Sequence, residues 1–375
     1  MAATALALKD INKLYERKGK PPVHAVKTLN MDVGKGEIIA LLGSSGCGKT
    51  STLRMIAGFE EASSGTITLA GRTINNLPPA GRNVAMAFEG YSLYPPLTVR
   101  QNIAFALKSA RIGREETDKR VAEIAALVEI ESILDRYPSS ISGGQQQRAS
   151  LARALVRRAD LYLLDEPMGQ LEPQLRSVLR GRIKNLLNQH EMTAIFVTHD
   201  QTEANALADR IAVMEGGVLQ QFAGEKDLKA EPANLYVATF IGEPPMNVFD
   251  AQVSERHGVT VLDVTGGPSL DFGGRGLSDS SVAALGGRTK VIVGIRPHHV
   301  QLGTGPFSAR VASNQWLGDQ SHLAADVAGK LLVGVSALRV RAAVGTTVAY
   351  DFAAENLHVF DPESGRAIVH RLTAA

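Results

Sequence analysis

The sequence predicts an α/β domain with a helical insert, followed by a domain built mainly of β-strands. Three observations support this fold class. A chain of 375 residues exceeds the length at which one hydrophobic core usually serves a whole protein. Short apolar runs alternate with helical patterns up to about residue 235, as they do in α/β proteins. Beyond that point paired glycines separate short strand-like runs, so we expect domains over residues 1–235 and 236–375.

Five short apolar runs are the predicted strands of the first domain. They lack the polar alternation of a strand with one solvated face, which is typical of strands buried on both faces of a parallel sheet. The expected strands are Ile38–Leu42, Val84–Phe88, Leu161–Leu164, Ala194–Val197 and Ile211–Met214.

Between Thr98 and Arg158 the sequence pattern is mostly helical. The segment Thr117–Ile130, for example, has apolar residues at helical spacing and charged residues between them, the pattern of an amphipathic helix. We therefore expect a helical subdomain over about residues 90–158, inserted in the α/β domain.

The second domain has short strand-like runs with glycine-rich turns between them. Examples are Val259–Val264 and Val291–Ile295. The runs His322–Val327 and Leu331–Val335, joined by Ala328-Gly329-Lys330, predict a β-hairpin. Many short strands of this kind favour a β-barrel or a sandwich.

The composition excludes several classes of protein. Hydrophobic residues make up 44% and charged residues 21% of the chain, which is typical of a globular protein. The longest apolar runs are far shorter than the roughly 20 residues of a membrane-spanning helix, and the N-terminus lacks the basic flank of a signal peptide. A net charge of +2 gives no reason to expect nucleic acid binding. One cysteine fits a reducing compartment, so we expect a cytosolic chain that reaches membranes through partners.

A phosphate-binding loop follows the first predicted strand. It consists of Gly43, Ser44, Ser45, Gly46, Cys47, Gly48, Lys49 and Thr50, with Ser51 next in a helix-compatible segment. Glycines let successive backbone N–H groups turn toward an anion at the start of a helix. In this pattern Lys49 contacts the β- and γ-phosphates and the Thr50 hydroxyl binds Mg²⁺. The alternative is a glycine-rich turn with a chance Gly-Lys-Thr, but the strand and helix on either side favour a site for ATP and Mg²⁺.

A second helix start lies about a hundred residues further on. In Ile141-Ser142-Gly143-Gly144-Gln145, Ser142 and Gln145 have the spacing of a capping box. A helix N-terminus capped in this way has free N–H groups suited to phosphate. A well-capped helix without a functional role is the alternative reading of this motif alone.

Polar residues also follow two of the predicted strands. Asp165 and Glu166 end the strand that begins at Leu161, and His199 ends the strand that begins at Ala194. Side chains at the carboxyl ends of parallel strands meet at the edge where such folds bind ligands. We expect Asp165 to hold Mg²⁺, directly or through water.

These motifs together resemble those of the ABC ATPase family, whose signature is similar to Ile141–Gln145. The resemblance implies that Glu166 polarises the attacking water and that His199 contacts the γ-phosphate. It also implies that Tyr15 stacks on adenine, although packing within a strand is the alternative for this residue. Two ATPase domains are then expected to pair head to tail. Ser142, Gly144 and Gln145 of one would close on ATP held by the other.

A narrower resemblance is to the maltose-type sugar-importer ATPases. It rests on Arg82–Phe88, Tyr91–Val99, Glu231–Asn234, Ile241–Asn247 and, in the C-terminal OB/TOBE-like regulatory barrel, Gly294–Pro297. It implies import of a sugar, polyol, glycerol phosphate or related solute. The implied partners are two transmembrane permeases, a second ATPase subunit and an extracytoplasmic solute-binding protein. The implied location is the cytoplasmic face of the inner membrane, as a peripheral subunit.

Three positions depart from the group. Glu89 stands where the group has a glutamine that reaches Mg²⁺, and its carboxylate still offers hard oxygen ligands. Glu172 replaces an aspartate, and His298 replaces a common glutamate. The altered residues are compatible with pairing to a different ATPase chain, or with harmless drift in a homodimer.

Rival functions fit the motifs less well. An exporter ATPase is the alternative among transporters, although exporter ATPases are commonly fused to membrane spans or lack this tail. Soluble ABC ATPases that act on nucleic acid or the ribosome usually carry two sets of motifs, and this chain has one. A P-loop kinase or GTPase would lack the segment Ile141–Gln145. A C-terminal barrel that binds oligonucleotides would be richer in basic clusters and aromatic residues.

Overall fold

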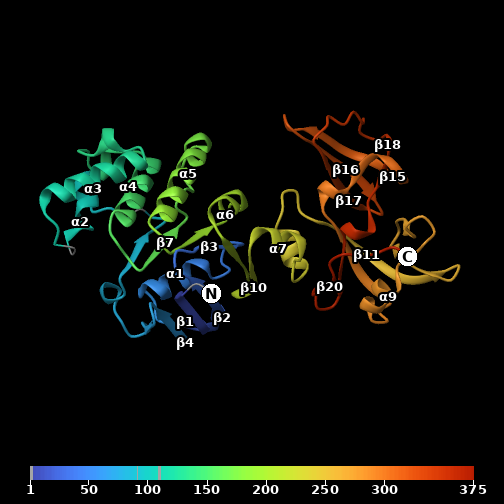
Figure 1. Ribbon diagram of the computed structural model, residues 1–375, viewed down its shortest axis with the longest axis horizontal. Helices are drawn as coiled ribbons and strands as arrows, with labels where there is room; N and C mark the ends of the chain where they lie inside the picture. Colours follow the sequence, from blue (N-terminus) through green and yellow to red (C-terminus); the bar gives the residue numbers. More distant parts are fainter. Residues whose placement is uncertain (1–2, 91, 109–110) are drawn as a thin grey trace. The chain divides into compact units, whose positions relative to one another are not determined.

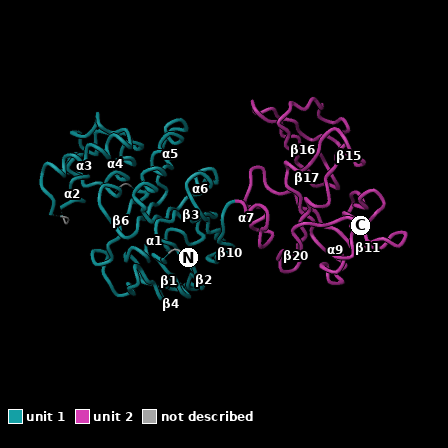
Figure 2. The backbone as a smooth tube through the Cα atoms, in the orientation of Figure 1, with its two compact units in different colours: residues 1–225 teal, residues 226–375 magenta. Residues whose placement is uncertain are grey.

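The computed structural model describes residues 3–90, 92–108 and 111–375, in two compact units (Figure 1, Figure 2). Unit 1 is Met1–Glu225 and unit 2 is Lys226–Ala375. The boundary near residue 235 inferred from the sequence stays a prediction, and Tyr91 of the importer-like segment lies outside the described residues. No helix in the described part of the chain has the length and apolar character needed to cross a membrane.

An antiparallel sheet begins unit 1. Its strands are β1 (Thr4–Arg17), β2 (Lys20–Gly34), β4 (Ser64–Leu69) and β5 (Arg72–Thr73), in the order β2-β1-β4-β5. Leu6 and Leu8 of β1 are buried while their neighbours are less so, an alternation of period two. Strands with this alternation contain no continuous apolar run, so the apolar runs of the sequence did not predict this sheet.

A six-stranded sheet forms the centre of unit 1. Its strands are β3 (Ile38–Gly43), β6 (Val84–Ala87), β7 (Leu161–Asp165), β8 (Ala194–Thr198), β9 (Arg210–Glu215) and β10 (Val218–Ala223). The order is β10-β9-β3-β8-β7-β6, and all neighbours are parallel except β9 and β10. Every residue of β3, β7 and β8 is buried. This burial explains the apolar runs and confirms the five predicted strands.

Helices cover the sheet and form the predicted insert. The core helices are α1 (Lys49–Ala57), α5 (Pro173–Gln189) and α6 (Gln201–Leu207), and the insert has α2 (Val99–Phe105), α3 (Arg114–Leu127) and α4 (Gly143–Leu155). The three insert helices lie beside one another (Figure 1). Short 3₁₀ turns occur at Pro79–Gly81, Glu131–Ile133 and Pro138–Ser140. One hydrophobic cluster joins Leu6 of the antiparallel sheet, Leu53 of α1 and Leu41 of the central sheet, which fixes α1 between the two sheets.

Unit 2 consists mainly of two open sheets. After α7 (Glu225–Ala230) and α8 (Leu235–Phe240), one sheet has the order β13-β12-β11-β14-β19-β20 and the other β17-β16-β15-β18. The strands are β11 (Asn247–Arg256), β12 (Val259–Val264), β13 (Ser269–Leu270), β14 (Lys290–Ile295), β15 (Gln301–Trp316), β16 (Ser321–Val327), β17 (Lys330–Ser336), β18 (Thr347–Asp351), β19 (Leu357–Phe360) and β20 (Ala367–Val369). The remaining elements are α9 (Asp279–Leu285) and 3₁₀ turns at Pro297–His299 and Ala354–Asn356.

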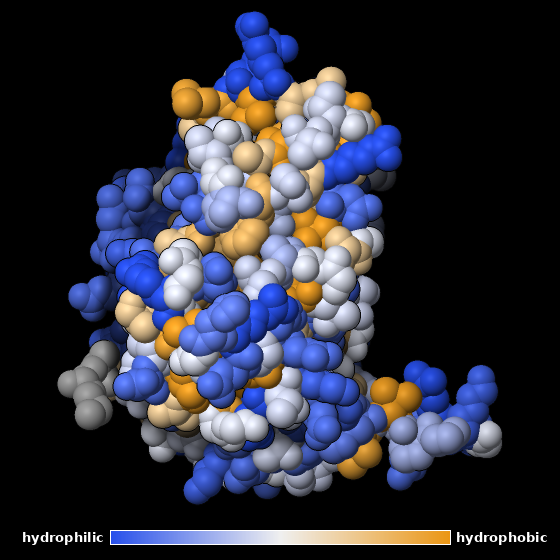
Figure 3. Space-filling model, turned by 90° about the vertical axis from the view of Figure 1, so that its right-hand side faces the viewer, coloured by the Kyte–Doolittle hydropathy of each residue, from blue (hydrophilic) through white to orange (hydrophobic). Residues whose placement is uncertain are grey.

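The two sheets of unit 2 share one core. Val293 and Val359 of the first sheet lie in the same buried cluster as Leu323 and Tyr350 of the second. Neither sheet closes into a barrel, although the arrangement is consistent with the predicted OB-like region. Apolar and polar surface are interspersed on the face drawn in Figure 3.

The hairpin predicted in unit 2 is confirmed. Val327 of β16 pairs with Lys330 of β17, so the loop is the two residues Ala328 and Gly329. Both have positive φ, 58° and 77°, as the tight turn of a twisted hairpin requires.

Candidate functional site

The glycine-rich loop joins the end of β3 to the start of α1, at the carboxyl edge of the central sheet. Gly48 has a φ of 101°, which side chains rarely tolerate. A Cβ atom on Gly48 would lie 2.4 Å from the carbonyl oxygen of Ala25. The loop can therefore reach α1 by this path only with glycine at position 48.

Lys49 and Thr50 begin α1 and point into the loop and the neighbouring strand. The Lys49 Nζ atom is buried and donates to the carbonyl oxygens of Gly43 at 2.7 Å and Ser44 at 2.9 Å. Thr50 Oγ1 donates to Asp165 Oδ1 at 3.4 Å. Cys47 is also buried, with its Sγ 3.6 Å from Lys49 Nζ.

A cavity of about 450 Å³ opens at this edge. It brings together most of the residues that the sequence analysis singled out. Those in its wall are Ser45, Gly46, Gly48, Lys49, Thr50, Ser51, Glu89, Glu166 and His199. Gly43, Ser44 and Cys47 lie behind the wall, in contact with Lys49.

Glu166 and His199 lie side by side in the wall of this cavity, directly after β7 and β8. His199 Nδ1 lies 3.0 Å from Glu166 Oε1, and this hydrogen bond raises the pKa of His199. The Glu166 side chain is 17% exposed and that of His199 74%. The Glu166 backbone has a φ of 47°, a left-handed conformation that side chains adopt at a cost. A carboxylate held in this way is suited to orient water beside a phosphate.

Asp165 lies deeper than Glu166. Burial raises its pKa to about 6, the negative charge of Glu89 adds to the increase, and the hydrogen bond from Thr50 counteracts it. A nearby cation would stabilise the ionised form of this buried carboxylate.

The oxygen donors here fit Mg²⁺. The Thr50 hydroxyl and the carboxylates of Asp165 and Glu89 are hard ligands, and Mg²⁺ commonly takes one or two protein oxygens together with water and substrate phosphates. No group of three or more His, Cys, Asp or Glu able to hold a metal exists among the described residues. The donor set therefore suits a metal that arrives with a phosphate ligand.

The signature segment lies outside this cavity wall. Ser142 caps α4, with its hydroxyl accepting from Gln145 N at 3.3 Å and Gln145 Oε1 accepting from Ser142 N at 3.0 Å. The predicted capping box is confirmed. Ser142, Gly144 and Gln145 do not line the cavity that contains Lys49.

Tyr15 of β1 contacts the first turn of α1. Its hydroxyl is 2.9 Å from Ser51 Oγ and also bonds to Glu60. Lys13 Nζ lies 4.8 Å from the centre of its ring. Burial and the bond to Glu60 raise the pKa of Tyr15, which keeps the hydroxyl protonated and anchored to Ser51.

The sequence analysis missed Gln147, Gly169 and Gln170, which also line the cavity. Gln147 is one of three successive glutamines in α4. In a helix, successive residues point to different sides, so only one of the three can face a given neighbour. The sequence alone does not show which of the three glutamines faces the cavity.

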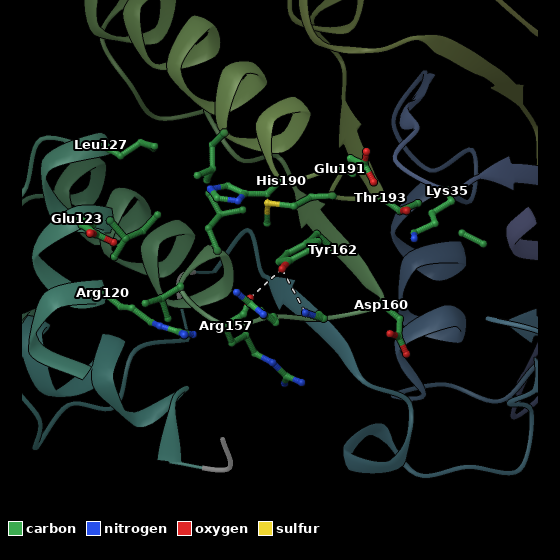
Figure 4. A pocket seen from close by; sticks show the side chains of 18 of the residues that line it. Lys35, Arg120, Glu123, Leu127, Arg157, Asp160, Tyr162, His190, Glu191 and Thr193 are labelled. Atoms are coloured by element: carbon green, nitrogen blue, oxygen red, sulfur yellow. Dashed lines mark hydrogen bonds between the residues drawn. The ribbon is translucent and has the colours of Figure 1, made fainter. Parts of the chain in front are cut away.

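A second cavity, of about 840 Å³, lies between the helical insert and the rest of unit 1 (Figure 4). Its wall includes Arg120 and Glu123 of α3, Tyr162 of β7 and His190 after α5. The Tyr162 hydroxyl donates to Arg157 O at 2.8 Å and accepts from Ala159 N at 3.2 Å. The wall of this cavity thus comes partly from the helical insert and partly from the central α/β part of unit 1.

Known proteins with similar sequences point in one direction. The family described as ABC transporter matches residues 26–169, and the TOBE domain family matches residues 293–360. The sn-glycerol-3-phosphate import ATP-binding protein UgpC 2 of Rhizobium johnstonii is 39% identical over 369 residues, covering 96% of this chain and 98% of that protein. The trehalose/maltose import ATP-binding protein MalK of Thermococcus litoralis is 41% identical over 370 residues, covering 92% and 96%.

A shorter match and a solved structure agree. The trehalose import ATP-binding protein SugC of Mycobacterium tuberculosis is 43% identical over 300 residues, covering 79% of this chain and 72% of that protein. The dimeric post-hydrolysis structure of the ATP-binding cassette MJ0796 with ADP and Pi matches with a TM-score of 0.55 and 27% identity. It covers 58% of this chain and 98% of its own.

Proposed function

The chain belongs to the ATP-binding subunits of ABC import systems, and on this premise we propose that it hydrolyses ATP at the loop Gly43–Thr50 to drive uptake of a small solute. One observation carries the proposal. The wall of one cavity holds Lys49 and Thr50 together with Glu166 and His199, so groups that can bind phosphate and groups that can orient water border the same space.

The residues have distinct roles in this proposal. The loop N–H groups and Lys49 bind the phosphates of ATP. Thr50, Asp165 and Glu89 hold Mg²⁺, which neutralises phosphate charge when bound. Glu166 accepts a hydrogen bond from the attacking water. His199, which is hydrogen-bonded to Glu166, contacts the γ-phosphate. The Tyr15 ring stacks on adenine, and its hydroxyl is anchored at Ser51.

The second half of the site comes from another ATPase subunit in this proposal. Ser142, Gly144 and Gln145 start a capped helix that does not line the chain's own cavity. A helix start of this kind suits the phosphates of ATP bound to a second copy or to a different ATPase chain. The matched cassette structure is dimeric, which supports such pairing.

The solute class follows from the relatives. Their printed names include glycerol 3-phosphate, trehalose and maltose importers, so we infer a sugar, polyol, glycerol phosphate or related solute. The implied partners are two permeases and an extracytoplasmic binding protein, with this chain at the cytoplasmic face of the membrane. Export and action on nucleic acid or the ribosome are the alternatives, and the import names favour neither.

The ATPase proposal is tested with Glu166→Gln in the purified full chain. Hydrolysis should fall by roughly three orders of magnitude, because the carboxylate acts mainly in the transition state. ATP binding should persist, and ATP should trap a stable dimer. Lys49→Ala should instead lose nucleotide affinity. A Glu166→Gln chain that hydrolyses ATP at the parental rate would show that the site is assigned wrongly.

A further inference from the structure

Gln147 lies on the buried face of α4, the helix that begins with the signature segment. It is 5% exposed. Gln145, two residues earlier, belongs to the capping box, and the Gln146 side chain turns away to the carbonyls of Pro138 at 3.0 Å and Ile141 at 3.3 Å. Gln147 alone of the three lines the nucleotide cavity.

The Gln147 amide bonds to the backbone on both sides of the loop that follows β7. Its Nε2 donates to the Glu166 carbonyl oxygen at 2.6 Å, and its Oε1 accepts from Gln170 N at 3.0 Å. Both groups of the amide are therefore used, and both partners are main-chain atoms that any side chain at those positions would present.

The start of α4 also rests on this loop. A Cβ atom on Gly144 would lie 3.2 Å from the Gln170 carbonyl oxygen, so the helix start and the loop are in close contact. Arg176 of α5 holds the loop from elsewhere, with NH2 donating to Leu171 O at 3.2 Å and NH1 to Asp200 Oδ2 at 3.2 Å. Asp200 follows His199 directly.

We propose that Gln147 is a positioning residue that holds the backbone of Glu166 and ties it to the signature helix of the same chain. The proposal rests on the ATPase function proposed above. The Gln147 amide therefore connects two functional parts through one loop. One is the Glu166 carboxylate of the chain's own site, and the other is the start of α4, which would contact ATP bound to a second subunit. A shift of that helix on pairing would then reach Glu166 directly.

The strained backbone of Glu166 explains why the contact matters. Glu166 has a φ of 47°, and such conformations persist only where surrounding contacts enforce them. The hydrogen bond from Gln147 Nε2 is one of those contacts. Without it the carboxylate can relax away from the water, and small displacements of a reacting group lower rates strongly.

The test compares Gln147→Met and Gln147→Glu in the purified full chain with Mg-ATP. Methionine has a similar length and offers no amide. We expect kcat to fall about tenfold or more with KM for ATP changed by less than about twofold. The glutamate variant should recover activity as the pH falls, because its protonated carboxyl can again donate to the Glu166 carbonyl. Gln147→Met should show no such recovery.

Gln146→Met is the matched control, because its side chain lies one position away on α4 and bonds to other carbonyls. It should keep the parental kcat and KM. A Gln147→Met chain with parental kcat would overturn the proposal, as would a loss of ATP affinity and melting temperature in step with kcat, which indicates a merely structural role. A parental chain without ATPase activity would instead contradict the proposed function.

Discussion

Each unit of the protein buries one arginine whose partners are backbone carbonyls. Arg82 of unit 1 is 3% exposed and Arg296 of unit 2 is 4% exposed. Arg82 donates to Met55 O at 2.7 Å, Ile56 O at 3.0 Å, Asn75 O at 2.9 Å and Leu77 O at 2.7 Å. Arg296 donates to Lys229 O at 3.1 Å, Ala238 O at 3.0 Å and Ile241 O.

Both arginines donate hydrogen bonds to carbonyl oxygens at the C-terminal ends of helices. Met55 and Ile56 lie in the last turn of α1, and Lys229 lies in the last turn of α7. Ala238 lies in the last turn of α8, and Ile241 follows that helix directly. Carbonyls at helix ends lack partners within the helix and carry partial negative charge. Burial lowers the pKa of both arginines, that of Arg296 to about 10, yet both stay charged at neutral pH.

The difference lies in what each arginine fixes. Arg82 holds the end of α1, the helix that begins with Lys49 and Thr50, and so supports the nucleotide site. Arg296 holds α7 and α8 against β14 within unit 2, where no residue of that site occurs. The same contact therefore lies behind the proposed nucleotide site in one unit and serves only packing in the other.

Arg82→Met should have the largest effect. It removes the four hydrogen bonds that Arg82 donates, at about 1 kcal/mol each, so unit 1 should lose about 4 kcal/mol of stability and most of its ATP affinity. Nucleotide titration with circular dichroism measures both. Trp316, the only tryptophan, lies in unit 2, and its fluorescence transition should stay unchanged. A shifted Trp316 transition would show that Arg82 also stabilises unit 2, which contradicts this prediction.

Arg296→Met should cost about 3 kcal/mol by the same reasoning, because three carbonyls lose their donor. Here the Trp316 fluorescence transition should move to lower denaturant, while ATP affinity keeps its parental value. Equal loss of ATP affinity in both variants would contradict the prediction that only Arg82 supports nucleotide binding.

Glu203→Gln should have an intermediate effect, confined to unit 1. Burial raises the pKa of Glu203 from 4.5 to about 7, so the folded chain binds a proton that the unfolded chain releases. Stability therefore falls as the pH rises between these values. The glutamine variant should be more stable at pH 8 by about 3 kcal/mol, with no gain at pH 4. A gain that is independent of pH would contradict this origin.

His358 should show the smallest effect, in unit 2 and with the opposite sign. Burial, the charge of Arg296 and nearby His370 lower its pKa from 6.5 to about 4. Between pH 6.5 and about 4 the unfolded chain binds a proton at His358 and the folded chain does not. The free energy of unfolding therefore decreases as the pH falls through this range. Between pH 7 and 5.5 we expect a loss of about 1 kcal/mol in the Trp316 transition. His358→Phe should remove most of that slope.

Local patterns in the sequence determined much of the fold. The five apolar runs of the central sheet, the loop Gly43–Thr50, the capping box at Ser142 and the hairpin after Val327 each involve neighbouring residues. Their backbone geometry follows from glycine, period and spacing, which are visible in the chain itself.

Only the tertiary structure decided which distant residues meet. Thr50 reaches Asp165 across 115 positions, and Gln147 rather than Gln146 faces Glu166 because of how α4 packs. The antiparallel sheet of β1, the open sheets of unit 2 and the carbonyls around Arg82 and Arg296 depend in the same way on pairing between remote segments. Hydrogen bonds and burial of this kind arise from packing, and packing has no signature in any single stretch of sequence.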